Sequence, residues 1–159
     1  MTAHSPSLRW RIVERPGGAL VEIAGHLDEN ADLAPLAPSL AGEVELHLAA
    51  IQRVNSTGIR EWVRFIHDLP SVTELSLSHC SPAIVTQLNT IYNFRGRARV
   101  RSLLAPYVCE ACGIEEYRLL DAAAARAPLP SLLCVRCGGP MEFDDLPERY
   151  LSFLKETAP

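Results

Sequence analysis

The stretch from Glu43 to Leu69 constrains the fold of this chain more than any other. Val44, Leu46 and Leu48 alternate with polar residues, which is the period of a β-strand with one buried face. Beyond a polar turn, apolar residues recur at helical spacing, at Ile59, Trp62, Val63 and Ile66. This order predicts a strand, a turn and an amphipathic helix in succession.

The turn is Asn55-Ser56-Thr57-Gly58, so two hydroxyl groups stand at the start of the predicted helix. The first N–H groups of a helix have no partner within it, and the helix dipole is positive there. A phosphate, or a phosphorylated side chain, can therefore be held at this position at low electrostatic cost. The alternative interpretation is that Ser56 and Thr57 simply cap the helix.

The same alternation of polar and apolar residues predicts further strands. They are Leu8–Glu14, Ala19–Ala24, Val72–Ser78 and Arg99–Leu104. The turn signal Pro16-Gly17-Gly18 predicts that the first two form a hairpin.

Two further helices are predicted between these strands. Ser81 is a suitable N-cap and Pro82 a suitable first residue for one of them. The other begins near Glu29, and we expect it to be short, kinked or broken because it contains Pro35 and Pro38.

The order of these elements predicts an α/β fold. We expect a mixed β-sheet with parallel core strands, an antiparallel first strand and helices mainly on one face. We expect this sheet and its helices to occupy residues 8–104. Residues 106–159 form a second part with a small cysteine module and a terminal helix over Asp144–Thr157.

Two Cys-x-x-Cys pairs are the clearest chemical signal in the chain. They are Cys109 with Cys112 and Cys134 with Cys137, and a glycine follows each pair. The spacing lets one turn present two thiolates, and four thiolates make a closed tetrahedral zinc site. We predict one structural Zn²⁺ in a zinc ribbon over about residues 106–143. Two redox-active dithiols are the alternative, but these need a Cys-x-x-Cys at a helix N-terminus.

Composition narrows the classes of partner. The formal net charge of −4 argues against a nucleic-acid-binding protein. No apolar run approaches the roughly 20 residues that span a bilayer. Residues 1–7 are polar and show no secretory signal. We therefore expect a cytoplasmic protein that does not bind membranes.

Arginines and histidines are the remaining candidates for binding. Arg95, Arg97, Arg99 and Arg101 recur at every second position and would share one face of a strand. A solvated face or a protected sheet edge is one interpretation, and a docking stripe for an acidic protein or anionic ligand is the other. The histidines are scattered and are interpreted as ordinary surface or boundary residues: His4, His26, His47, His67 and His79.

Three short stretches match motifs that occur in the same order in one family. Glu22–Asp28 resembles a hydrophobic–Gly–x–Leu–Asp opening, Asn55–Ile59 an Asp-Ser-Ser/Thr-Gly-Leu turn, and Cys80–Val85 a Ser-Pro-x-Val helix entry. These are motifs of the STAS domain, the fold of bacterial anti-sigma factor antagonists. The resemblance covers residues 8 to about 104.

The resemblance implies a non-enzymatic bacterial regulator whose partner is a protein, such as a kinase-type anti-sigma factor. It would dock through Asp28, Asn55, Ser56, Thr57 and Gly58. In the family, phosphorylation of the hydroxyl residue just before the glycine blocks docking. That residue is Thr57 here, with Ser56 beside it. The family's acidic residue before the hydroxyls is Asn55 here, which leaves two alternatives: a structural or oligomeric protein without a phosphoswitch, and a nucleotide-binding protein.

Overall fold

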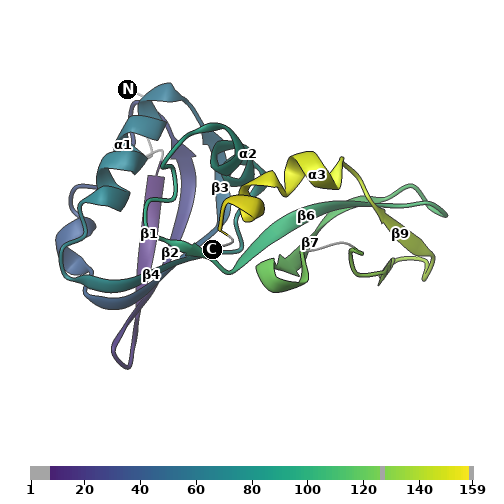
Figure 1. Ribbon diagram of the computed structural model, residues 1–159, viewed down its shortest axis with the longest axis horizontal. Helices are drawn as coiled ribbons and strands as arrows, with labels where there is room; N and C mark the ends of the chain where they lie inside the picture. Colours follow the sequence, from purple (N-terminus) through teal and green to yellow (C-terminus); the bar gives the residue numbers. More distant parts are fainter. Residues whose placement is uncertain (1–7, 126–127, 158–159) are drawn as a thin grey trace, which may run out of the picture.

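The computed structural model describes residues 8–125 and 128–157. Figure 1 shows two β-sheets that follow one another along the long axis of the molecule. The N-terminal sheet carries α1 and α2, and the C-terminal sheet carries the four paired cysteines.

The first sheet has five strands in the order β1-β2-β3-β4-β5. They are β1 Leu8–Arg15, β2 Gly18–Leu27, β3 Gly42–Val54, β4 Val72–Ser78 and β5 Arg99–Val100. β1 is antiparallel to β2, and all the other neighbours are parallel. The predicted α/β fold with a mixed sheet is confirmed.

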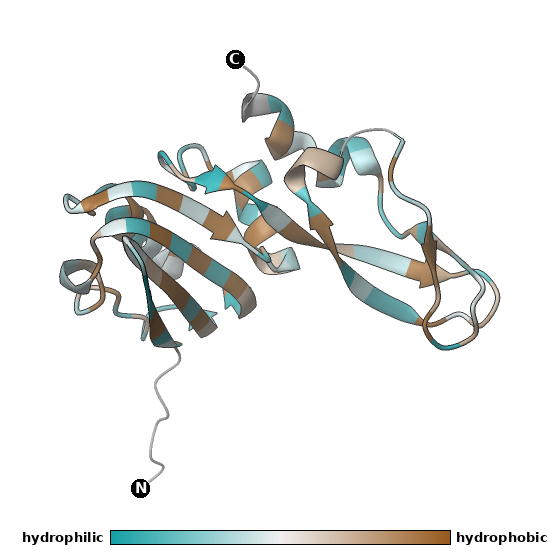
Figure 2. Ribbon diagram, turned by 90° about the horizontal axis from the view of Figure 1, so that it is seen from below, coloured by the Kyte–Doolittle hydropathy of each residue, from teal (hydrophilic) through white to brown (hydrophobic). Residues whose placement is uncertain are grey.

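The alternation of residues decides which face of this sheet is buried. Val21, Leu46 and Leu77 lie side by side on adjacent strands and are almost completely buried. Glu45 and Arg99, one position away along their strands, belong to the opposite face and remain in contact with solvent. Figure 2 shows the resulting alternation of hydrophobic and hydrophilic residues along the strands.

Two helices cover the apolar face, α1 Ser56–His67 and α2 Pro82–Thr90. Trp62 of α1 is buried, and its indole N–H donates to the carbonyl of Phe94 at 2.8 Å. The N-cap of α2 is Ser81, whose hydroxyl accepts from Ile84 N–H at 3.4 Å. Within the described ranges, no helix is long and apolar enough to cross a membrane.

The segment before β3 contains less helix than predicted. In place of a helix from Glu29 to Leu40 there are turns and the 3₁₀ helix η1, Ala37–Ser39. Pro35 and Pro38 remove two N–H groups that an α-helix would use. Leu33 instead donates its N–H to the Glu61 carboxylate of α1 at 2.8 Å, so tertiary contacts hold this segment.

The chain passes from the first sheet to the second without a linker. The N–H of Arg101 donates to the carbonyl of Leu77 at 2.8 Å, and that of Leu104 donates to Cys80 at 2.9 Å. The predicted strand Arg99–Leu104 is therefore divided: β5 ends at Val100, and β6 runs from Ser102 to Cys109. β6 continues through Ala105 and Pro106, so the two sheets are joined by extended backbone.

The second sheet has four strands in the order β7-β6-β9-β8, all antiparallel. They are β6 Ser102–Cys109, β7 Glu115–Asp121, β8 Leu132–Leu133 and β9 Pro140–Phe143, and the 3₁₀ helix η2, Ala122–Ala124, follows β7. The two shortest strands are those that flank the second cysteine pair. This sheet is consequently small, and turns make up much of it.

The C-terminal segment returns to the first half of the molecule. It contains α3 Pro147–Tyr150 and the 3₁₀ helix η3 Ser152–Thr157, where a single helix over Asp144–Thr157 was predicted. Asn89 of α2 donates its amide N–H to Tyr150 O at 2.9 Å and accepts from Phe153 N–H at 2.9 Å. The Tyr150 hydroxyl donates to Leu104 O of β6 at 2.6 Å. The segment is thus bonded to both α2 and β6.

The four alternating arginines do not share one strand face. Arg95 and Arg97 lie in a turn before β5, Arg99 lies in β5, and Arg101 lies between β5 and β6. The Arg97 guanidinium donates to three backbone carbonyls, those of Leu69, Val72 and Thr73. The turn separates this structural arginine from the two that follow it.

Candidate metal centre and partner surface

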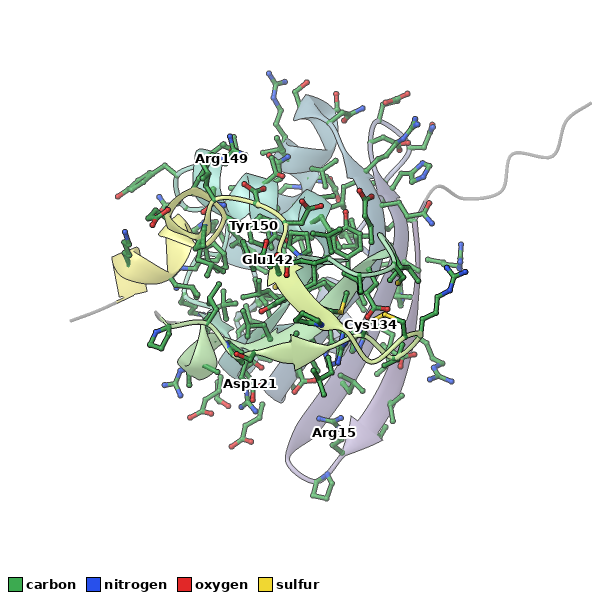
Figure 3. The ribbon with its side chains drawn as sticks, turned by 90° about the vertical axis from the view of Figure 1, so that its right-hand side faces the viewer. Arg15, Asp121, Cys134, Glu142, Arg149 and Tyr150 are labelled. Atoms are coloured by element: carbon green, nitrogen blue, oxygen red, sulfur yellow. The ribbon has the colours of Figure 1, made fainter. Side chains whose placement is uncertain are left out.

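The four paired cysteines come together at the far end of the second sheet. Cys109 ends β6, Cys134 follows β8, and Cys112 and Cys137 lie in the two adjoining turns. All four Sγ atoms lie within 4.8 Å of one another. Figure 3 looks at the molecule from this end, with sulfur atoms drawn beside the Cys134 label.

The distances between the sulfurs fit a shared ion. Cys109 Sγ lies 3.4 Å from Cys137 Sγ, and Cys112 Sγ lies 3.8 Å from Cys134 Sγ. A disulfide would hold two sulfurs about 2.05 Å apart, so these are free thiols. Four sulfurs placed tetrahedrally at about 2.3 Å from one zinc ion would be about 3.8 Å apart. The cluster could therefore bind one metal ion, and its ligand set suits zinc.

Backbone N–H groups in the turns favour the thiolate forms that a metal requires. The N–H of Cys112 donates to Cys109 Sγ at 3.5 Å, and this bond is the main cause that lowers the pKa of Cys109 to about 6. In the second turn, the N–H of Gly139 donates to Cys137 Sγ at 3.4 Å and lowers its pKa, but the neighbouring thiols outweigh this bond and raise the pKa of Cys137 to about 12. Gly113 and Gly138 have φ angles of 78° and 75°, as predicted for the glycines after each pair.

Gly139 is a part of the centre that sequence reasoning missed. A Cβ atom at this position would lie 2.8 Å from Ala111 Cβ and 3.3 Å from Cys137 Sγ. Gly138 needs its positive φ angle, whereas Gly139 needs the empty space that allows the two turns to approach. The doubled glycine in the sequence was the signal that could have revealed it.

The predicted partner surface lies at the other end of the molecule, at the start of α1. Asn55 is the N-cap, and its Oδ1 accepts from Gly58 N–H at 2.9 Å. Its Nδ2 donates to the carboxylate of Glu29 at 2.9 Å. Asn55 therefore uses both its amide oxygen, as an acceptor, and its amide nitrogen, as a donor. The aspartate of the family motif could replace only the acceptor.

Ser56 and Thr57 are exposed to solvent in the first turn of α1. Gly58 is buried, and a Cβ atom there would lie 1.8 Å from the carbonyl oxygen of Leu27. The glycine is thus required because α1 approaches the end of β2 closely. The hydroxyl residues form the accessible part of the turn, while Gly58 positions it.

Asp28 and a polar hollow lie beside this turn. The Asp28 carboxylate accepts from Asn30 N–H at 2.9 Å, so it closes a local turn instead of capping a helix. The hollow measures about 530 Å³ and extends from Asp28 and Glu29 past Asn55 to Thr86 and Gln87 of α2. A partner could therefore contact the hydroxyls and this hollow together.

Glu29 belongs to this surface, and sequence reasoning did not identify it. It lies 26 residues from Asn55 in the chain, so no local pattern links the two side chains. Only the return of β3 beside β2 brings them together.

Two of the histidines interpreted as scattered are stacked in the structure. The rings of His47 and His79 lie 4.1 Å apart between centroids. Burial lowers the pKa of His79, and His47 lowers it further, while Glu45 acts in the opposite direction. His79 also has a positive φ of 51°, and its N–H donates to the Ser102 hydroxyl at 2.8 Å where the two sheets meet.

Comparison with known proteins adds no family assignment. No protein-family model matches this chain, and no curated protein matches it either. The structure itself supports a mixed α/β sheet joined to a four-cysteine cluster that could hold a metal ion.

Proposed function

We propose that this protein is a non-enzymatic regulatory module that binds a protein partner through the start of α1. The binding surface comprises Asp28, Asn55, Ser56 and Thr57, with Gly58 holding the turn in place. A kinase-type anti-sigma factor is the partner class that the STAS resemblance implies. Three sequence motifs that resemble those of STAS domains, in the same order along the chain, support this proposal.

One observation carries the proposal: two adjacent hydroxyls are exposed on a rigid helix start. Asn55 caps the helix, and Gly58 fits closely against Leu27. A kinase could reach Ser56 and Thr57, and a phosphate there would add nearly two negative charges to a packed interface. Phosphorylation would thus act as an off-switch for docking.

The metal centre has a separate role in this proposal. We infer that it holds one zinc ion and that the ion is structural. All four ligand positions of a tetrahedral ion would be filled by cysteines, which leaves no open position for a substrate or water. Zinc therefore stabilises the second sheet and takes no part in a reaction.

The test is to measure how substitutions at Thr57 change partner binding. The partner is first isolated from native cells with the tagged full-length protein and is then titrated in purified form. Thr57→Glu is expected to weaken binding by at least an order of magnitude, because the charge would be desolvated at the interface. Thr57→Ala should bind as the wild type does.

Ser71→Glu is the matched control, because Ser71 is exposed and lies outside the proposed surface. It should leave the affinity unchanged. Phosphopeptide mapping of protein from the same cells identifies which hydroxyl is modified. Equal affinities for wild type, Thr57→Glu and Thr57→Ala would refute the docking surface.

A scaffold without a phosphoswitch is the second candidate, and the contact between Asn55 and Glu29 favours it. A phosphate on Ser56 or Thr57 would stand near the Glu29 carboxylate, which opposes added negative charge. In that case the partner would bind, but no phosphate would be found on either hydroxyl.

A further inference from the structure

A hollow lies where three segments distant in sequence meet. β5 provides one wall, η2 a second, and the C-terminal segment of α3 and η3 the third. Its volume is about 870 Å³. Binding sites for small molecules commonly measure about 300–1,000 Å³, so the hollow is large enough for one.

The walls of the hollow are mainly aliphatic. They include Val100, Ala122, Ala125, Leu129, Leu151 and Leu154. Val100, Ala125 and Leu151 are almost completely buried, and the other three are half-buried. Such walls offer an apolar chain a favourable place, because it leaves water without losing hydrogen bonds.

Arginine and lysine side chains stand at the same hollow. Arg99, Arg101 and Lys155 all line it. The side chains of Arg99, Arg101 and Lys155 have no hydrogen bond or ion pair with any residue of the described ranges. Arg97 differs from them, because its guanidinium donates to three backbone carbonyls. Two acids, Asp121 and Glu148, also line the hollow, so among the described lining residues the cations exceed the acids by one.

Arg99 and Arg101 mark the mouth of the hollow. They also line a smaller polar recess of about 300 Å³, which contains Glu43 and Glu74 on the charged face of the first sheet. The two arginines therefore stand between an apolar interior and a polar exterior. Because both arginines line the hollow and the recess, their guanidinium groups can reach one anion where the two meet.

We propose that this hollow binds a free fatty acid. Its acyl chain would lie against the aliphatic walls, and its carboxylate would bind Arg99 and Arg101. A guanidinium group matches a carboxylate with two parallel hydrogen bonds, which a neutral alcohol or ester cannot accept in the same way. This site is separate from the start of α1, and the inference does not depend on the proposed regulatory function.

Calorimetric titration of the zinc-loaded full-length protein tests the site, with dodecanoate as the probe. Dodecanol supplies the same chain without the charge. Dodecanoate should bind at least an order of magnitude more tightly than dodecanol, since charge-assisted hydrogen bonds form only with the carboxylate. Replacing both arginines, Arg99→Gln and Arg101→Gln, should remove that difference and leave dodecanol binding unchanged.

The matched control replaces two arginines outside the hollow, Arg9→Gln and Arg60→Gln. It makes the same change in net charge and should leave dodecanoate binding intact. Ala122→Phe fills the hollow and should abolish binding of both probes. If this variant has a lower melting temperature, Ala123→Phe makes the same test from an exposed position of the lining.

Three results would overturn the proposal. The first is no heat of binding with dodecanoate, and the second is equal affinity for dodecanoate and dodecanol. The third is sedimentation of the protein with phosphatidylglycerol vesicles that contain no fatty acid, because the arginines would then serve a membrane surface.

Discussion

The two sheets of this protein differ in the interactions that stabilise them. In the first, Val21, Leu46 and Leu77 are completely buried beneath α1 and α2. In the second, large apolar side chains remain in solvent: Tyr117 is 57% exposed and Leu133 is 67% exposed. Burial of apolar surface can account for the stability of the first sheet, whereas the second sheet leaves these apolar side chains exposed and brings four thiols together.

This difference shows how stability can be divided within one short chain. A two-residue strand such as β8 cannot hold its position by pairing alone. An ion bound by Cys134 beside β8 and by Cys109 at the end of β6 would fix both strands at once. The expected consequence is that metal removal affects the two halves unequally.

The largest expected effect is on the metal centre. Cys134→Ser should abolish zinc binding, and because structural zinc contributes about 10–16 kcal/mol of apparent free energy in zinc-finger peptides, the second sheet should lose its order. Hydrogen exchange with mass spectrometry should show lost protection in residues 109–143 and retained protection in β3 and β4.

Cys80→Ala is the control for this variant, because Cys80 is buried between the sheets and lies outside the cluster. It should retain one zinc ion per chain. A Cys134→Ser protein that keeps full protection in residues 109–143 would contradict the division between the halves.

A matched pair of leucine substitutions probes the apolar contribution. Leu46→Ala removes a completely buried side chain from β3 and should lower the free energy of unfolding by about 2–5 kcal/mol. Leu119→Ala acts on a side chain of β7 that is 52% exposed and should cost less than about 1 kcal/mol. Urea denaturation of the zinc-loaded proteins measures both, and equal losses would remove the contrast between the sheets.

A smaller effect is expected at the start of α1. Asn55→Asp keeps the acceptor for Gly58 N–H but replaces the donor to Glu29 with a like charge. The substitution should cost about 0.5–1 kcal/mol more in the wild type than in a Glu29→Gln background. A double-mutant cycle on thermal stability gives this coupling energy, and a value near zero would mean that the contact with Glu29 contributes nothing.

The smallest effect concerns pH and the stacked histidines. Burial lowers the pKa of His79 from 6.5, with a smaller contribution from His47 against the opposing Glu45, so the unfolded chain binds this proton at a higher pH than the folded protein does. The contribution of neutral His79 to stability is therefore present above pH 6.5 and is lost as the pH falls through the lowered folded pKa. Denaturation midpoints measured from pH about 7.5 to about 5 should fall less steeply in His79→Asn.

Asparagine is chosen because it tolerates the positive φ of 51° at this position. Parallel pH profiles for the wild type and His79→Asn would show that other groups cause the dependence.

Local patterns were sufficient to predict much of this structure. Alternating residues such as Val44, Leu46 and Leu48 predict both a strand and the face that it buries. Four strands of the first sheet were therefore predicted close to their positions. The spacing of the cysteine pairs similarly predicted their convergence. Each of these features is indicated by a short local pattern, either the alternation within one strand or the spacing within one Cys-x-x-Cys pair.

The features that could not be predicted depend on contacts between distant residues. Leu33 donates to Glu61 across 28 positions, and this bond helps to replace the expected helix with turns. The hydrogen bond from Asn55 to Glu29 and the stacking of His47 on His79 likewise span the fold. Alternation could not show that the strand predicted over Arg99–Leu104 divides into β5 of the first sheet and β6 of the second, because the pattern continues through the division.

The return of the C-terminal segment to Asn89 gives the two halves a second attachment. The chain leaves the first sheet through the continuous backbone of β6 and returns to α2, where the Asn89 side chain donates to Tyr150 O and accepts from Phe153 N–H. Loss of the Asn89 side chain would remove this second attachment, and the second sheet would then be held to the first mainly by the backbone bonds around β5 and β6.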